Sequence, residues 1–315
     1  MATPKKPAVK VIDRKKKLPA YRSFRLSRRI KSRDIKTLPR SSELWKETLR
    51  FIWIHKKQFV VFLMIYSFAY AALVKGTSGF TFDMEYVKEE LFIATSGNIE
   101  AIISFITIYA SLISSLTATA DEISNFYQTL IYVLFSLALI WLIRKQHSRI
   151  RNVTVKQSFY SGMTPLIPFL GVILILVLEM LPVVFGTTLL SSAYESDAIR
   201  SNTDILIFSI VFILTFILSV YLLAGSIFAL YIVTIPGVGP LVAVRSSLQL
   251  LRIHRWRILL RVVRFYFELI LLGFIAILPF IIWLPRYAEI AFFIMGSLSF
   301  GIMHVYMYKL YKSIL

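Results

Sequence analysis

The sequence predicts an all-α integral membrane protein with six transmembrane helices, arranged as three hairpins that each follow a short amphipathic helix. Of its 315 residues, 57% are hydrophobic and 17% are charged, and the mean hydropathy is +0.71. Soluble domains are about half apolar and a quarter charged. Apolar runs long enough to cross a hydrocarbon core of about 30 Å recur along the chain. Clusters of Lys and Arg separate these runs, as they do in multi-pass membrane proteins.

The first 42 residues are expected to form a disordered basic tail on the cytoplasmic side. Residues 1–57 hold 19 Lys and Arg and 4 Asp and Glu, which is a net charge of +15 out of +19 for the chain. The tail contains four prolines and no sustained helical period, which is typical of disorder. No apolar core follows the first charges, so the tail does not resemble a signal peptide.

Residues 43–315 are expected to form one membrane domain. Helices are the default because backbone groups in lipid must hydrogen bond internally. The fourth apolar run is much longer than about 20 residues, so we expect its end to leave the membrane before Pro236, in the PGVGP stretch. The predicted spans are 58–74, 125–143, 163–185, 205–234, 262–284 and 288–308.

The distribution of positive charge predicts the orientation of the spans. Segments 1–57, 144–162, 235–264 and 309–315 hold 32 of the 36 Lys and Arg. The loops on the other side hold only Lys75, Lys88, Arg200 and Arg286, together with eleven acidic residues. The excess of positive charge marks the cytoplasmic side. Both termini are therefore expected in the cytoplasm.

The segment 101–118 is apolar and nearly long enough to span the membrane. A seventh span there would reverse everything after it and place Arg144, Lys145, Arg149 and Arg151 on the side that is poor in positive charge. Ser and Thr residues also recur along it at helical spacing. We therefore expect a helix that lies in the outer interface or re-enters from it, with a seventh span as the alternative.

A repeat precedes the first, third and fifth spans. Residues 45–55 (WKETLRFIWIH) and 244–254 (VRSSLQLLRIH) align without a gap, and residues 155–159 (VKQSF) match the first five positions. The shared pattern is an apolar residue, a basic residue, any residue, a hydroxyl and an apolar residue. It predicts amphipathic helices on the inner leaflet, whose basic residues contact anionic lipid headgroups. These expected contacts are Lys46, Arg50, Lys156, Arg245 and Arg252.

On these residues the chain resembles a known family. The stretch LVAVRSSLQLLRIHRWRILLRVV after a long fourth span looks like the membrane domain fused to some bacterial glycerophosphodiester phosphodiesterases. The opening LPRSSELWKETLRFIWIHKKQFVVFLMIY resembles membrane proteins of candidate-phylum bacteria. The resemblance covers about residues 40–315 and implies three helix-plus-hairpin units in a bacterial plasma (inner) membrane. It implies no phosphodiesterase activity, because the catalytic domain is missing.

The sequence contains no recognisable catalytic signature. There is no Cys, the four His residues are far apart and form no HExxH motif, and there is no phosphate-binding GxxxxGK[ST] loop. The serines of the two TSG stretches, at 77–79 and 95–97, have no His in the same region to act as a base. We therefore expect no enzymatic activity, no metal site and no cofactor.

Three ionisable residues fall inside the predicted spans: Glu179, Glu268 and His304. A charge in lipid needs a partner or a wet cavity. Glu179 is expected toward the outer end of the third span, where it can reach interfacial water. Glu268 and His304 lie near the cytoplasmic ends of adjacent antiparallel spans, so they could pair, and Glu268 could instead pair with Arg264 one turn earlier. Such groups serve either as a proton, cation or headgroup site or as a contact between helices.

The functional expectation is a non-enzymatic membrane component that organises or assists lipids or partner proteins. Its basic tail and amphipathic helices would hold anionic headgroups, at about 1 kcal/mol per basic residue. Nucleic acid is an unlikely partner, because the tail offers only Tyr21 and Phe24 for stacking. The alternative is a small transporter of a solute or lipid, coupled through the three intramembrane residues.

Overall fold

A computed structural model describes residues 39–76, 79, 83–95, 99–116, 121–148, 153–196, 201–252 and 255–315. The fold-class prediction is confirmed, since the described residues form helices and no strands. The predicted tail lies outside the described residues as far as residue 38. Both TSG stretches also fall largely outside them.

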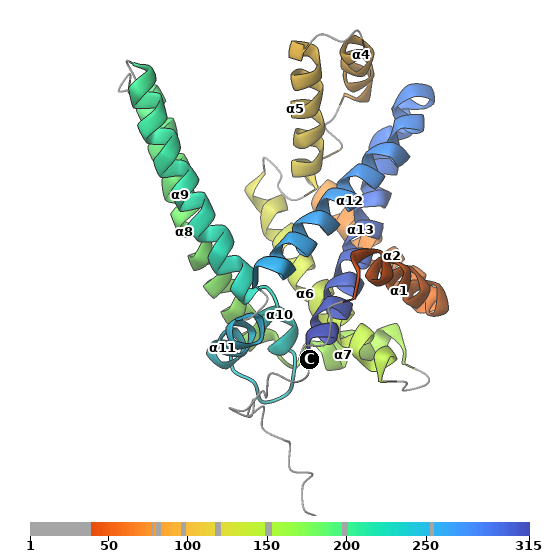
Figure 1. Ribbon diagram of the computed structural model, residues 1–315. Coiled ribbons are helices and arrows are strands. Elements are labelled where there is room, and N and C mark those ends of the chain that lie inside the picture. Colours follow the sequence, from red (N-terminus) through yellow and green to blue (C-terminus); the bar gives the residue numbers. More distant parts are fainter. Residues whose placement is uncertain are drawn as a thin grey trace, which may run out of the picture. The chain divides into compact units, whose positions relative to one another are not determined.

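Six helical segments are long and apolar enough to cross a membrane (Figure 1), as predicted. Two of them contain a change of helix: α2 continues into the π-helix η1, and α9 is followed by the short α10. Their bounds are α2 Lys56–Tyr70 with η1 Ala71–Lys75, α6 Glu122–His147, α8 Leu166–Glu195, α9 Asn202–Ser226 with α10 Ala229–Ile232, α12 Arg255–Trp283 and α13 Pro285–Ile314.

Three short helices stand directly before α2, α8 and α12, where the repeat predicts them. They are α1 (Ser41–Ile54), α7 (Val155–Gly162) and α11 (Pro240–Leu251). Thr154 caps α7 by accepting a hydrogen bond from the Gln157 N–H at 3.3 Å, and Pro240 occupies the first turn of α11. We call the side of the molecule that carries these three helices and the end of α13 the basic side.

The main core lies between α2, α6 and α13, with α1, α7, α10 and α11 packed against their ends on the basic side. Aromatic rings fill much of it. Tyr66 of α2 stacks on Phe300 of α13 with ring centroids 4.7 Å apart, and Phe265 of α12 stacks on Tyr306 of α13 at 3.9 Å. Such pairs add to the dispersion contacts that hold helices together in lipid.

A second, smaller core lies away from the basic side. There α4 (Met84–Ala94) and α5 (Ile99–Ser115) form a hairpin that packs on α12 and α13. Residue 105 of α5 contacts residue 274 of α12, and residue 109 contacts residues 270 and 274, so the two helices run antiparallel. The segment 101–118 is thus a helix through residue 115, and it is shorter than the six spanning segments.

The hairpin of α8 and α9 is the least buried part of the membrane domain. Only 11% and 6% of the most apolar stretches of these two spans are buried in the protein. Both helices pack mainly on each other and otherwise contact α10, α11, α12 and α6. The two helices lie apart from α12 over most of their length (Figure 1). Their remaining surface is therefore left to lipid.

The fourth span, Thr203–Ile232, ends before Pro236 as predicted. Its helix is interrupted, because α9 stops at Ser226 and α10 begins at Ala229. The residues after the interruption belong to the core, where Phe228, Ala229 and Val233 are fully buried.

Candidate anion-binding site

The three short helices share a pattern of burial that follows the repeat in the sequence. The hydroxyl position is fully buried in each helix and donates to a backbone carbonyl at 2.6 to 2.7 Å. These residues are Thr48, Ser158 and Ser247. The basic position is exposed in each helix, at Lys46, Lys156 and Arg245. Each helix therefore turns its hydroxyl toward the protein and its basic residue away from it.

The surfaces of α1 and α11 divide between the protein and its surroundings. Leu44 of α1 and Ala243 of α11 are buried beside the buried hydroxyls, whereas Leu49 and Leu241 are 52% and 63% exposed. Small and hydroxyl side chains on the packed face let helices approach closely. The exposed leucines are left for the lipid.

A pocket of about 410 Å³ lies between the start of α1 and the first half of α12. We call it the α1–α12 pocket. Its lining combines three guanidinium groups with two hydroxyls and one apolar side chain, namely Arg40, Arg261, Arg264, Ser41, Ser42 and Leu260. The N-terminus of the 14-residue helix α1 also lies here, and helix N-termini favour anions.

One carboxylate is bonded to a lining residue of this pocket without lining it itself. Glu268 accepts a hydrogen bond from the Arg264 Nε at 2.6 Å and another from the Trp45 indole N–H at 2.5 Å. The Arg264 side chain is 66% exposed, and a guanidinium has five donors. Glu268 therefore fixes the Nε end of Arg264 and joins α1 to α12, while the pocket keeps a net positive charge.

A second pocket, of about 320 Å³, lies where the end of α9 meets the start of α12. We call it the α9–α12 pocket. Its lining is Tyr221, Ala224, Arg252, Arg255, Trp256 and Leu259. The Arg255 guanidinium lies over the Tyr221 ring at 4.4 Å from the centroid. Arg252 is exposed.

Gly225 is required for this arrangement. A Cβ atom added to Gly225 would approach the Arg255 guanidinium to 3.2 Å and the Leu248 side chain more closely still. The Gly225 carbonyl also accepts the hydrogen bond of the buried Ser247 hydroxyl at 2.7 Å. The glycine therefore lets α11 and Arg255 approach the end of α9 at the same time.

The three intramembrane candidates do not form one site. Glu268 pairs with Arg264 and Trp45, as the sequence allowed for Arg264. Glu268 and His304 do not pair, because each is held by other residues. Glu179 accepts a hydrogen bond from the Ser226 hydroxyl at 2.5 Å and lies near the middle of α8. The sequence predicted a shorter span with Glu179 toward its outer end, but α8 has 30 residues and extends well beyond Glu179 in both directions.

His304 is buried between three helices. One ring nitrogen lies 3.1 Å from the Ser136 hydroxyl of α6, and the other lies 3.2 Å from the Tyr231 hydroxyl of α10. Nearby, the Arg144 guanidinium donates to the Tyr231 carbonyl at 2.8 Å and to the Thr234 carbonyl at 2.6 Å. These bonds hold α10 against α6 and α13, which is a structural role.

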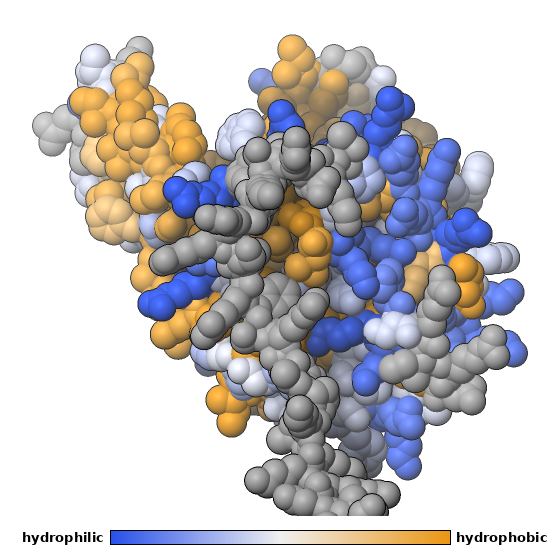
Figure 2. Space-filling view, turned by 60° about the horizontal axis from the view of Figure 1, so that its bottom comes forward, coloured by the Kyte–Doolittle hydropathy of each residue, from blue (hydrophilic) through white to orange (hydrophobic). Residues whose placement is uncertain are grey.

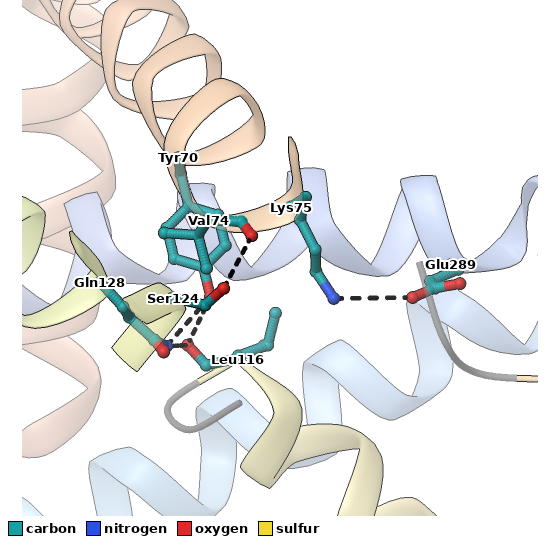
Figure 3. Close-up of polar contacts among 7 residues, drawn as sticks. All are labelled: Tyr70, Val74, Lys75, Leu116, Ser124, Gln128 and Glu289. Atoms are coloured by element: carbon teal, nitrogen blue, oxygen red, sulfur yellow. Dashed lines mark hydrogen bonds and ion pairs between the residues drawn. The ribbon is translucent and has the colours of Figure 1, made fainter. Parts of the chain in front are cut away.

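A further polar cluster lies where α5 ends beside α2 and α6 (Figure 3). The Leu116 carbonyl accepts hydrogen bonds from the Gln128 amide at 2.7 Å and the Tyr70 hydroxyl at 3.2 Å, and also from the Tyr132 hydroxyl. Lys75 and Glu289 form an ion pair at 3.7 Å between η1 and α13. These contacts tie the α4–α5 hairpin to the ends of the spans that lie away from the basic side.

Hydrophilic side chains gather on the basic side, whereas hydrophobic side chains cover much of the surface of the α8–α9 hairpin (Figure 2).

The sequence predicted Arg252 as a contact for anionic lipid, but it did not predict this role for Arg40, Arg261 and Arg264. Arg264 was expected only as a partner of Glu268. The spacing of Arg261 and Arg264, three residues apart on one helix, places them on the same face. That signal was present, but the meeting of this face with the start of α1 is a tertiary contact.

Within the described part of the chain, no three His, Cys, Asp or Glu side chains lie close enough together to hold a metal ion. Comparisons with protein-family models, curated proteins and solved structures give no match.

Proposed function

We propose that this multi-pass membrane protein binds anionic lipid headgroups on its basic side and has an organising role without enzymatic chemistry. The observation that carries the proposal is the α1–α12 pocket, which gathers three guanidinium groups and two hydroxyls at one end of the spanning helices. Guanidinium groups bind phosphate through paired, charge-assisted hydrogen bonds. We take the anion bound at this end of the spanning helices to be the phosphate of a lipid headgroup.

The proposal places the basic side in the cytoplasm, at the inner leaflet of a bacterial plasma membrane. Three exposed basic residues at equivalent positions support this orientation: Lys46, Lys156 and Arg245. Each adds about 1 kcal/mol of attraction to an anionic surface. The resemblance to the membrane domain of glycerophosphodiester phosphodiesterases remains part of this proposal, because it implies three such helix-plus-hairpin units.

The positions of the intramembrane residues favour this proposal over a coupled transporter. Glu179, Glu268 and His304 lie in three separate clusters, and the Glu268–His304 pair is not formed. Their hydrogen-bond partners join neighbouring helices, as expected of structural contacts.

Native mass spectrometry of the full chain in mild detergent tests the proposal. The protein is mixed with phosphatidylglycerol or with phosphatidylcholine. We expect phosphatidylglycerol to be retained at a fixed stoichiometry and phosphatidylcholine to be lost. The double substitution Arg40→Gln with Arg261→Gln should reduce retention several-fold, because two of the three guanidinium groups are removed.

Arg286→Gln provides the matched control, because it removes the same charge near the opposite ends of the spans. It should leave retention unchanged. Equal retention of both lipids, or an equal loss in the Arg286 variant, would contradict a specific site in the α1–α12 pocket. A thermal melt of each variant shows whether the fold is intact.

A further inference from the structure

We propose that the α9–α12 pocket holds the headgroup of an anionic glycerophospholipid whose acyl chains lie between α9 and α12. The inference rests on the proposed function, since it assumes a protein that binds anionic lipid from the membrane. It depends on different residues from those of the α1–α12 pocket, so the two proposals can fail separately.

The end of the site that would hold the headgroup combines two cationic side chains with two aromatic rings. Arg252 and Arg255 supply the positive charge, and Tyr221 and Trp256 form the walls. Tyr221 is 54% exposed and Trp256 is 67% exposed, and such aromatic residues are typical of the headgroup region. The Arg255 guanidinium lies over the Tyr221 ring, and the Glu179 carboxylate is near enough to interact with it. These neighbours orient the guanidinium before a phosphate arrives.

Apolar residues continue from this pocket along both helices. On α9 the face above Tyr221, at steps of three and four residues, carries Ile217, Leu214 and Ile210. On α12 the face above Leu259 carries Val263, Tyr266 and Ile270. All six are between 38% and 61% exposed. Both surfaces are thus open to acyl chains.

The apolar surface on α12 has the length that one leaflet requires. From Trp256 to Ile270 the helix rises about 21 Å, and one leaflet of the hydrocarbon core is about 15 Å thick. At its far end the Tyr109 hydroxyl of α5 donates to the Ile270 carbonyl at 3.4 Å. The surface therefore begins at arginines and ends under the α4–α5 hairpin.

The occupant must combine a negative head with an apolar tail. A free phosphate would use the arginines and leave the six apolar side chains uncovered. An apolar helix from a partner would cover these side chains but bring no anion to Arg252 and Arg255, of which Arg255 already lies near the Glu179 carboxylate. An anionic glycerophospholipid satisfies both ends, and it is present in the surrounding membrane.

The test is photocrosslinking of the full chain in phosphatidylcholine vesicles that contain phosphatidylglycerol with a photoreactive group in the middle of an acyl chain. Adducts are located by mass spectrometry of peptides. We expect several-fold more adducts on residues 210–217 and 263–270 than on the exposed residues Val60, Met64 and Phe68 of α2. Those α2 residues serve as the reference for ordinary lipid contact.

Arg252→Gln combined with Arg255→Gln should lower the adducts between α9 and α12 to the α2 level. Arg257→Gln, at an exposed position of the same helix that does not line the pocket, should leave them unchanged. Unaltered adducts on α2 show that the double variant is still folded. If it does not fold, Arg252→Lys with Arg255→Lys keeps the charge and should retain part of the excess.

Three results would overturn the inference. The first is equal labelling by a phosphatidylcholine probe, which would mean that the arginines do not favour an anionic lipid over a neutral one. The second is loss of the adducts when inorganic phosphate is added, which would make the pocket a site for a free anion. The third is an unchanged pattern in a folded double glutamine variant. Arg40→Gln with Arg261→Gln should leave these adducts in place, which separates this inference from the proposed function.

Discussion

His304 is a titratable residue in a spanning helix whose two ring nitrogens both have hydrogen-bond partners. Its two ring nitrogens face the hydroxyls of Ser136 and Tyr231, so α6, α10 and α13 meet at one imidazole. The ring is 6% exposed. A neutral imidazole can donate from one nitrogen and accept at the other, which matches two hydroxyl partners.

His304→Ala should destabilise the protein by about 2–4 kcal/mol. The substitution leaves a cavity and removes the partner of two buried hydroxyls. Ser136→Ala should cost about 1 kcal/mol, because it removes one bond and little volume. Denaturant unfolding in detergent micelles measures both values. Equal effects of the two substitutions would show that the imidazole is not the centre of this contact.

Gly186→Ala should loosen the α8–α9 hairpin. A Cβ atom at Gly186 would collide with the Thr215 side chain, whose hydroxyl already donates to the Val211 and Phe212 carbonyls. The overlap should cost about 1–3 kcal/mol. Gly273→Ala is the matched control, because the nearest atom to its Cβ would be the Tyr109 hydroxyl at 3.8 Å. The control should melt at or above the wild-type temperature, since Ala favours helix.

Asp121 should contribute stability that depends on pH. The Ser124 hydroxyl and N–H donate to its carboxylate at 2.7 and 2.8 Å, and they hold the pKa of Asp121 below its usual value. The stabilisation is therefore complete above the unfolded pKa and is lost as the pH falls through the folded one. Carboxyl NMR titration checks this, and Ser124→Ala should raise the pKa.

At the scale of elements, the short helix α1 is held by a few identifiable contacts. Trp45 packs against Phe265 at 5.2 Å between ring centroids and donates to Glu268. Glu47 forms an ion pair with Lys309 of α13 at 3.5 Å. These contacts add to the buried side chains of Leu44 and Phe51 in holding one wall of the α1–α12 pocket in place.

Trp45→Phe should weaken the attachment of α1 while keeping an aromatic ring in place. Loss of a hydrogen bond to a charged acceptor costs about 1.5–3 kcal/mol. Trypsin should then cut faster after Lys46 and Arg50. Trp53→Phe is the control, because Trp53 is 72% exposed and lies away from Glu268. Similar cleavage rates for the two variants would argue against the Trp45–Glu268 bond as the anchor.

The sequence predicted the six spans and three short helices because these depend on local patterns of apolar and basic residues. It did not predict the details that depend on contacts between distant segments. The pattern of α11 did not single out Ala243, yet this residue is fully buried, because close approach to another helix favours a small side chain. The bond from Trp45 to Glu268 likewise depends on packing that no local pattern reports, whereas the pair of Arg264 and Glu268 follows from their spacing of four residues.

The number of spans determines which loops and termini lie on the same side of the membrane. With six spans, residues 42, 148 and 313 lie on one side and residues 95 and 196 on the other. If α5 also crossed the membrane, residues 148 and 313 would be opposite to residue 42. The chain has no Cys, so single cysteines at Ser42, Ser148, Ser196 and Ser313 can be labelled cleanly.

We expect a membrane-impermeant thiol reagent added outside to label the Ser196→Cys variant in intact cells. The other three variants should react only after the membrane is opened. A reversed pattern for all four would overturn the proposed orientation and keep six spans. Labelling of Ser148→Cys and Ser313→Cys together, without Ser42→Cys, would instead establish a seventh span at α5.

The limited contact between the α8–α9 hairpin and the rest of the protein has a consequence for biogenesis. Its two helices pack on each other, with a Ser201 cap on α9, and both are rich in apolar residues. We therefore expect them to leave the translocon as a finished pair, before α11 and α12 have been synthesised. Contacts with α6 can form at this stage, whereas those with α11 and α12 complete the docking later.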